Sequence, residues 1–163
     1  MSDFPTIDGY ATHLPLLVAA TVITGGPVIE CGGGIFSTPI LRAICGAQNR
    51  RLTTFENYPA WFEVVRHDGA VLVDSWGDLP KYDLHCSLAF VDSEPAESRT
   101  PCIEAVRHHA QIIVVHDTNS DNPGVEDALQ RFRYRIDDKR QLPWTSAVSD
   151  TVDVERLLRR AIG

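Results

Sequence analysis

The chain has 163 residues, of which 44% are hydrophobic and 23% are charged, and these values are typical of a folded globular protein. Its formal net charge of -7 argues against a surface that neutralises nucleic-acid phosphates. We therefore expect one domain over residues 1–163 and no nucleic-acid partner.

The sequence lacks the marks of membrane insertion and of secretion. No apolar run approaches the ~18 residues that a spanning helix requires, and no basic segment with an apolar core follows the first residues. The cysteines contain no C-x-x-C pair that would indicate a zinc site or a disulfide framework. We expect buried thiols, no membrane partner and a cytoplasmic location.

Short apolar runs alternate with amphipathic stretches, a pattern that predicts βα units on a mostly parallel sheet. We predict a helix over residues 11–24 and a strand at 27–30. A glycine turn at 32–34 leads to a helix that Ser37 caps and that runs to about residue 45. Further strands are predicted at 52–56 and 70–76, with a short helix at 60–65 between them.

The sequence pattern of the second half predicts two more βα units, followed by two strands without a helix between them. Strands at 84–92 and 112–115 are followed by helices at 100–109 and 124–132. Strands at 132–136 and 144–148 then flank a polar turn before a final helix at 152–162. This predicts a terminal antiparallel hairpin, whereas a purely parallel dinucleotide domain would continue with another βα unit.

A glycine run and a downstream acid indicate a cofactor site. The run at residues 32–34 lies at a strand-to-helix turn, where glycine lets a ligand approach the backbone and the helix start offers free N–H groups. Glu56 ends the next strand, roughly 20 residues later, at the place of a ribose-binding acid in nucleotide-type folds. Tight turns also use glycine for backbone reasons alone, but the two features together favour a cofactor.

Five segments give a more specific indication: E-C-G-G-G, F-S-T-P, T-F-E-N, F-V-D-S-E-P and V-V-H-D-T. Together they resemble small class I S-adenosylmethionine-dependent methyltransferases over nearly the whole chain. The resemblance implies an α/β three-layer sandwich with a mostly parallel, Rossmann-like seven-stranded sheet in the order 3-2-1-4-5-7-6. It also implies S-adenosylmethionine as the cofactor.

The resemblance further implies which residues contact that cofactor. Glu30 and the glycines match the motif that lines the methionine moiety, and Glu56, which we expect near solvent, matches the acid that binds the ribose hydroxyls. Phe36 departs from the pattern, because a third glycine often stands there. The implied cofactor-binding residues are Glu30, Gly32, Gly34, Ser37, Thr38, Glu56, Asn57, Asp74, Ser75, Trp76, Asp92 and Ser93.

Polar residues also follow the fourth and fifth predicted strands, where carboxyl ends converge on the ligand crevice of an open α/β sheet. Asp92, His116 and Asp117 are the candidate catalytic residues, and Glu94 and Arg99 lie nearby in the sequence. His116 is a candidate base for the proton of a methyl acceptor. The alternative is that Asp117 or a backbone carbonyl only fixes its ring.

Asp92 and Asp117 also resemble two metal-ligand positions of catechol-type methyltransferases. Thr118 departs from that pattern, which has an asparagine there, and a hydroxyl is a poorer ligand than an amide oxygen for a hard cation. We therefore expect no metal site, with Mg2+ as the alternative. His13 and the other histidines outside these motifs have no partner at metal spacing, and we expect structural roles for them.

These observations predict methyl transfer from S-adenosylmethionine to a small-molecule substrate. Two alternatives stay open: a non-catalytic protein that binds an adenosyl cofactor, and a nicotinamide-dependent oxidoreductase, against which the terminal hairpin argues. The acceptor is expected to be held by the loops after the fourth and fifth strands, by the N-terminal segment before Ala11, or by a second subunit, which leaves a homodimer open.

Overall fold

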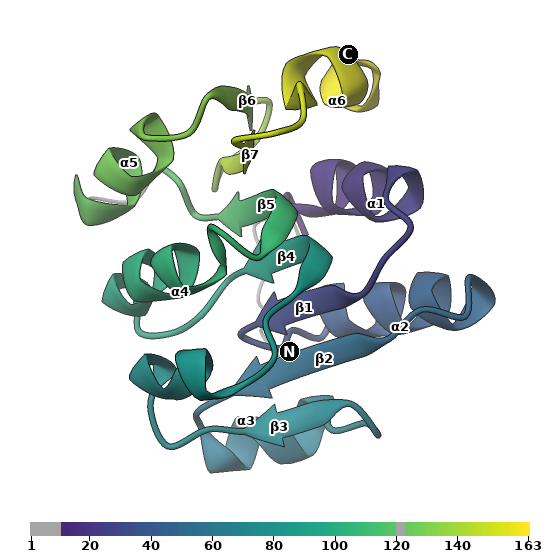
Figure 1. Ribbon diagram of the computed structural model, residues 1–163, viewed down its shortest axis with the longest axis vertical. Helices are drawn as coiled ribbons and strands as arrows, with labels where there is room; N and C mark the ends of the chain where they lie inside the picture. The colour runs from purple at the N-terminus through teal and green to yellow at the C-terminus, as the bar shows by residue number, and fades with distance from the viewer. Residues whose placement is uncertain (1–10, 120–122) are drawn as a thin grey trace, which may run out of the picture.

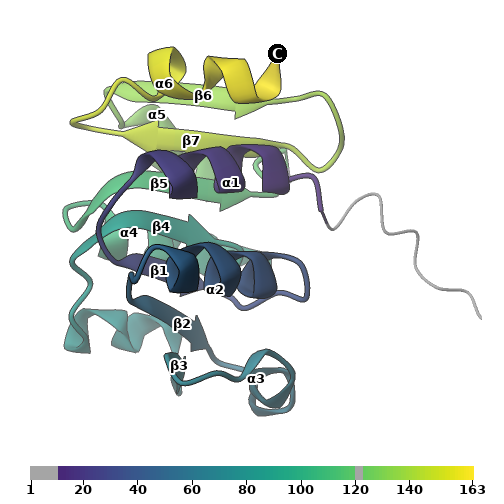
Figure 2. The same cartoon turned by 90° about the vertical axis from the view of Figure 1, so that its right-hand side faces the viewer.

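The computed structural model describes residues 11–119 and 123–163 and places one mixed sheet between two layers of helices (Figures 1 and 2). The first half contains α1 (Leu14–Ile23), β1 (Val28–Cys31), α2 (Ser37–Ala47), β2 (Leu52–Glu56), α3 (Pro59–Val65), β3 (Ala70–Leu72) and the 3-10 helix η1 (Trp76–Lys81). The second half contains β4 (Cys86–Val91), the short 3-10 turn η2 (Ala96–Ser98), α4 (Arg99–Val106), β5 (Ala110–His116), α5 (Pro123–Gln130), β6 (Tyr134–Asp138), β7 (Thr145–Ser149) and α6 (Val154–Ile162).

The strand order is β3-β2-β1-β4-β5-β7-β6, as the family resemblance implied. The pairs among β1 to β5 are parallel, whereas β7 runs antiparallel to both β5 and β6. The predicted terminal hairpin is therefore confirmed. Because β7 is reversed, its first residue, Thr145, pairs with His116 at the carboxyl end of β5.

Each face of the sheet carries its own apolar core, because the central strands are buried on both sides. Successive residues of a strand point to opposite faces, so Leu88 and Phe90 belong to one core and Ala89 and Val91 to the other. Figure 2 shows α1, α2 and α6 over the first of these faces, and Figure 1 shows α4 and α5 on the opposite side. This arrangement leaves the strand ends free to form a site.

The third strand is shorter than predicted. It ends at Leu72, and Trp76 begins the 3-10 helix η1 instead of ending a strand. Two local features account for the change: the Ser75 hydroxyl accepts a hydrogen bond from the Gly77 N–H, and Pro80 has no N–H to offer a sheet ladder.

The two helices that flank β1 begin at other residues than predicted, α1 later and α2 one residue earlier. His13 is the residue before α1, and the helix starts at Leu14 with Pro15 in its first turn, so the predicted start at residue 11 is wrong. Phe36, not Ser37, is the cap residue of α2, and Ser37 is already helical. Only the one-residue shift of α2 falls within the usual uncertainty of helix ends.

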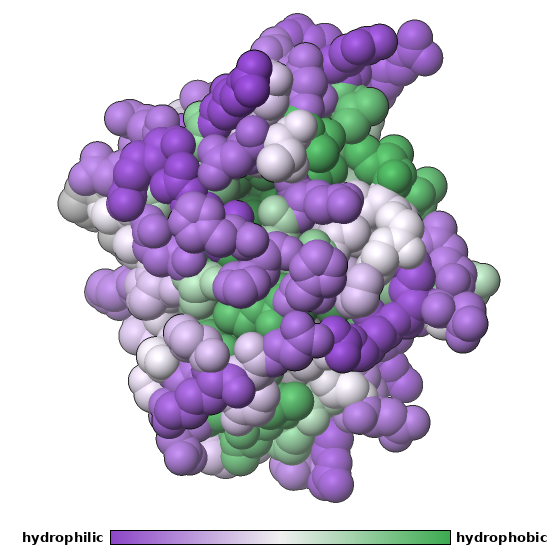
Figure 3. Space-filling view, viewed as in Figure 1, coloured by the Kyte–Doolittle hydropathy of each residue, from purple (hydrophilic) through white to green (hydrophobic). Residues whose placement is uncertain are grey.

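The face shown in Figure 3 is largely hydrophilic, with a more apolar strip over α1 and α6. Val22 and Ile23 of α1 and Leu157 of α6 are among the exposed hydrophobic side chains. None of the helices in the described part of the chain has the length and apolar character needed to cross a membrane.

Candidate functional site

The carboxyl ends of β1, β2, β4 and β5 lie at one edge of the sheet, because these strands are adjacent and parallel. Most of the predicted site residues follow these strand ends. We call residues 32–36, between β1 and α2, the glycine loop.

Gly32 is required by the packing of the glycine loop against the end of β4. Its φ angle is +89°, and a Cβ atom there would lie 2.4 Å from the carbonyl oxygen of Asp92. The Gly32 N–H donates to the carbonyl of Phe55 in β2. A side chain at this position would therefore separate two strand ends that both border the candidate site.

Glu56 holds the glycine loop from the neighbouring strand. One carboxylate oxygen accepts the Gly33 N–H at 3.2 Å, and the other accepts the N–H groups of Asn57 and Tyr58 at 2.9 and 3.0 Å. The side chain is only 5% exposed, so the expectation that it lies near solvent is wrong. Hydrogen bonds from three backbone N–H groups hold the Glu56 carboxylate inside the protein. The sequence does not predict these hydrogen bonds.

Glu30 lies beneath the glycine loop and is fully buried. Its Oε2 atom accepts hydrogen bonds from the hydroxyls of Thr38 and Thr54, at 2.9 and 2.7 Å. Burial raises the pKa of Glu30 to about 7, although the neighbouring hydroxyls oppose this shift. Thr38 also accepts the Gly34 N–H, so these contacts join β1, β2, the loop and the start of α2.

The implied cofactor-binding residues that follow β2 and β3 separate into two groups. Asp74 and Ser75 are exposed and Asn57 is partly buried, so all three have access to a ligand. Trp76 is buried in the core, and its ring N–H donates to the carbonyl of Glu94 at 2.9 Å. In this conformation Trp76 supports the loop after β4.

A charged cluster of Asp92, Glu94, Arg99 and Asp117 lies at the ends of β4 and β5. Arg99 is 2% exposed, and its Nη2 atom lies 3.2, 3.1 and 2.7 Å from carboxylate oxygens of Asp92, Glu94 and Asp117. The predicted convergence of these residues is therefore observed. Ser93 instead points into the core, where it accepts a hydrogen bond from Ser98.

Asp92 and His116 are in contact inside this site. The His116 Nδ1 atom lies 3.2 Å from Asp92 Oδ1, and its Nε2 atom lies 3.0 Å from the Thr12 hydroxyl. Burial alone would raise the pKa of Asp92, but His116 and Arg99 beside it hold that pKa below its usual range. Asp92 is therefore a carboxylate at neutral pH.

Asp117 has an unusual backbone. Its φ angle is +56°, in the left-handed region that non-glycine residues seldom occupy. Aspartate tolerates this region better than most residues, and such strain often occurs at functional sites. The turn directs Asp117 back to Arg99, which binds it at 2.7 Å.

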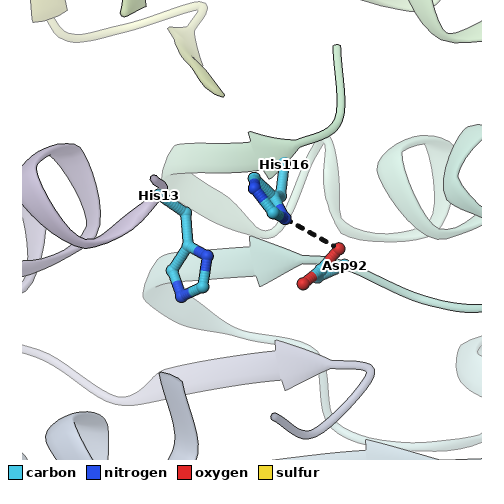
Figure 4. A group of neighbouring side chains, drawn as sticks. All are labelled: His13, Asp92 and His116. Carbon is cyan, nitrogen blue, oxygen red and sulfur yellow. Dashed lines mark ion pairs between the residues drawn. The ribbon is translucent and has the colours of Figure 1, made fainter. Parts of the chain in front are cut away.

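His13 is the residue that the sequence analysis missed. It lies at the start of α1 and is buried, with its ring centroid 4.7 Å from that of His116 and 5.0 Å from that of Phe90. Figure 4 shows His13, Asp92 and His116 facing one another. Donor atoms of the three residues all lie within 4.8 Å of one another, so the expectation that His13 has no partner at metal spacing is wrong.

Burial, together with the proximity of His116, lowers the pKa of His13 to about 4. The ring is therefore neutral at physiological pH. Neither ring nitrogen has a hydrogen-bond partner among residues 11–119 and 123–163. The contact between His13 and His116 could not be predicted from the sequence. α1 precedes β1, and strand pairing does not fix the position of this helix on the sheet.

Solved structures with the same architecture include the cofactor-bound Rv0187 protein from MTB. That chain aligns at a TM-score of 0.66 and 22% identity, over 92% of this chain and 85% of its own. Human methyltransferase-like protein 13 in complex with SAH aligns at 0.57 and 12% identity, over 94% and 90% of the two chains. The chain has the fold of class I methyltransferases.

The fold also occurs in an enzyme that is not named a methyltransferase. Spermidine synthase from Thermotoga maritima aligns at a TM-score of 0.59 and 13% identity, over 96% of this chain and 63% of its own. No family model and no curated protein sequence matches the chain. The reaction must therefore be argued from the site itself.

Proposed function

We propose that this protein binds S-adenosylmethionine at the edge formed by β1, β2 and β4 and transfers its methyl group to a small molecule. The observation that carries the proposal is the arrangement of this edge in a class I fold. Glu56 and the glycine loop lie at the ends of β1 and β2, and the charged cluster lies at the ends of β4 and β5. Cofactor and acceptor would thus meet at Asp92.

S-adenosylmethionine would supply an electrophilic methyl group for a nucleophilic atom of the acceptor and would leave as S-adenosylhomocysteine. The protein's task is to align the two and to receive the proton that the acceptor loses. The side chains of Asp92 and Asp117 are 24% and 29% exposed, whereas that of His116 is only 5% exposed. We therefore assign contact with the acceptor to the two carboxylates, and assign the positioning of Asp92 to His116.

Two observations support a small acceptor. The net charge of -7 is unsuited to a nucleic-acid substrate, although one protein of similar fold is an rRNA methylase from Streptococcus thermophilus. A cavity of about 290 Å³ lies between the start of α1 and the β6–β7 turn, lined by Ala11, Thr12, Pro15, Asp138, Arg140 and Gln141. This volume suits a small molecule, and Thr12 connects the cavity to His116.

Calorimetry with three ligands tests the cofactor. We expect saturable binding of S-adenosylmethionine and S-adenosylhomocysteine and no binding of NAD, because the reversed β7 belongs to the methyltransferase fold and not to a dinucleotide domain. Saturable NAD binding with no binding of either adenosyl compound would contradict the proposal and favour an oxidoreductase.

Methyl-labelled S-adenosylmethionine tests the reaction. The protein is incubated separately with a panel of small hydroxyl and amine compounds, with total RNA and with a protein extract. Label that appears in small molecules supports the proposal, and label confined to RNA or protein contradicts the acceptor class. Tight cofactor binding without transfer to any of them would favour the non-catalytic alternative.

A further inference from the structure

Three segments far apart in the sequence bring potential metal ligands together beside the charged cluster. His13 comes from the start of α1, Asp92 follows β4 and His116 ends β5, and Figure 4 shows their side chains directed at one another. His13 and His116 are 2% and 4% exposed. One donor atom from each of the three residues lies within 4.8 Å of the other two.

The ring nitrogens of His13 have no role in the fold that the described residues explain. Both are buried without a hydrogen-bond partner in those parts of the chain. A buried polar atom without a hydrogen-bond partner lowers the stability of the fold. Such atoms therefore normally bind a water molecule, a ligand or an ion. An imidazole nitrogen with a free lone pair is a common ligand of transition metals.

The hydrogen bonds of Thr12 fix which nitrogen of His116 carries the proton. The Thr12 hydroxyl donates to the carbonyl of Pro143 at 2.7 Å, so its oxygen accepts from the His116 Nε2–H at 3.0 Å. The lone pair of Nδ1 then lies 3.2 Å from the carboxylate oxygen of Asp92, without a hydrogen bond from any described residue. Two electron-rich atoms at this distance repel each other unless a proton or a metal ion lies between them.

The local charge also suits a divalent cation. Asp92, Glu94 and Asp117 share the single guanidinium of Arg99, which leaves two negative charges among these four groups. Arg99 already bridges Asp92 and Asp117, the acid pair that resembles the magnesium ligands of catechol-type enzymes. The Asp92 oxygen that Arg99 contacts, Oδ1, is also the oxygen 3.2 Å from the His116 Nδ1 atom.

We propose that His13, Asp92 and His116 form a three-ligand site for a divalent transition metal ion of the Zn2+ class. Two imidazole nitrogens and one carboxylate suit such an ion and not Mg2+ or Ca2+, which prefer oxygen ligands. Tetrahedral ligands at zinc distances are about 3.4 Å apart, so the widest separation has to close by at most about 1.4 Å. Thr12 would orient His116 from the second coordination layer, as such hydrogen bonds do at zinc sites.

The site is tested by metal binding to the whole chain, independently of methyl transfer. Protein freed of metal and of any histidine tag is titrated with Zn2+ alone by calorimetry and with Co2+ alone by visible absorption. We expect one equivalent of each to bind. In the Co2+ form of the wild type, NMR should show paramagnetically shifted N–H signals from two imidazole rings, which requires no variant.

Variants identify the ligands. His13→Phe keeps a ring that packs beside Phe90, and we expect it to lose at least about 100-fold in Zn2+ affinity, while Thr12→Val should lose about 10-fold. His85→Ala, which removes an exposed histidine, is the matched control and should bind as the wild type does. Zn2+ should raise the melting temperature of the wild type and of His85→Ala, but not of His13→Phe.

Three results would overturn the proposal. Absence of stoichiometric Zn2+ binding by the wild type would mean that a second proton on His116 fills the space beside Asp92. Unchanged affinity in His13→Phe, or a Co2+ form without two shifted imidazole signals, would place the metal elsewhere, for example on the cysteines.

Discussion

The carboxyl groups of Glu30 and Glu56, in β1 and β2, are held by neighbouring backbone and hydroxyl groups, whereas the carboxylates at the ends of β4 and β5 are held by one arginine. Glu56 accepts three backbone N–H groups, and Glu30 accepts two threonine hydroxyls. Asp92 and Asp117 instead share Arg99. The first region is locked by local structure, whereas the second depends on side chains that can reorganise around a ligand.

Substitution of Gly32 should lower the unfolding free energy more than the other substitutions do. A side chain there would push apart the ends of β1 and β4, where the two regions touch. In Gly32→Ala the new methyl group would overlap the Asp92 carbonyl at a positive φ angle, so we expect a loss of about 4 kcal/mol in unfolding free energy. Urea denaturation measures this loss. Gly46→Ala in α2 is the control: its Cβ meets nothing within 4 Å, and it should stabilise the helix by about 0.5 kcal/mol.

The pH dependence of stability tests the buried carboxyl of the first region. Since burial raises the pKa of Glu30 to about 7, the folded protein keeps this proton at pH values where the unfolded chain has lost it. Stability therefore falls as the pH rises from roughly 4.5 toward 7, by about 3 kcal/mol in total. Glu30→Gln should lack this decline. Parallel stability curves for the two proteins between pH 4.5 and 8 would mean that Glu30 is ionised in the fold.

Removal of the shared arginine tests the second region. Arg99→Met keeps an apolar chain but leaves Asp92 and Asp117 without their cation, and we expect a loss of about 2 kcal/mol. The loss is smaller than for a fully buried pair, because both carboxylates are partly exposed and can turn toward water. Arg51→Met, which breaks the exposed pair with Asp83, should change stability by less than about 0.5 kcal/mol. Equal effects in the two variants would contradict a structural role for Arg99.

The smallest expected effects are changes in the affinity for S-adenosylhomocysteine. They test whether the first region binds the cofactor and the second region binds the acceptor. Glu56→Ala should weaken S-adenosylhomocysteine binding by about 1.5 kcal/mol through lost charge-assisted hydrogen bonds. Asp117→Asn should change this affinity by less than about 0.5 kcal/mol, because we place Asp117 on the acceptor side. Calorimetry at constant pH measures both. A large loss in Asp117→Asn would instead place that residue next to the cofactor.

The sequence predicts those parts of the site that strand register positions. Once β1, β2, β4 and β5 are recognised as adjacent and parallel, the convergence of Glu56, Asp92 and Asp117 follows from topology. The same reasoning fails for His13, because α1 lies outside the βα units and strand pairing does not fix its position on the sheet. It also fails for Trp76 and Glu30, whose burial depends on partners that propensity does not encode.

The packing of α1 has a consequence for synthesis on the ribosome. Among the described elements α1 is made first, yet its neighbours include β4, β5 and β7, and α6, which is made last, packs beside it (Figure 2). Its buried leucines, Leu16 and Leu17, stay uncovered until those later segments emerge, so this face closes only after most of the chain has been translated. His13 can reach Asp92 and His116 only after β4 and β5 have emerged, so the contact between the two histidines reports that α1 has docked on these strands.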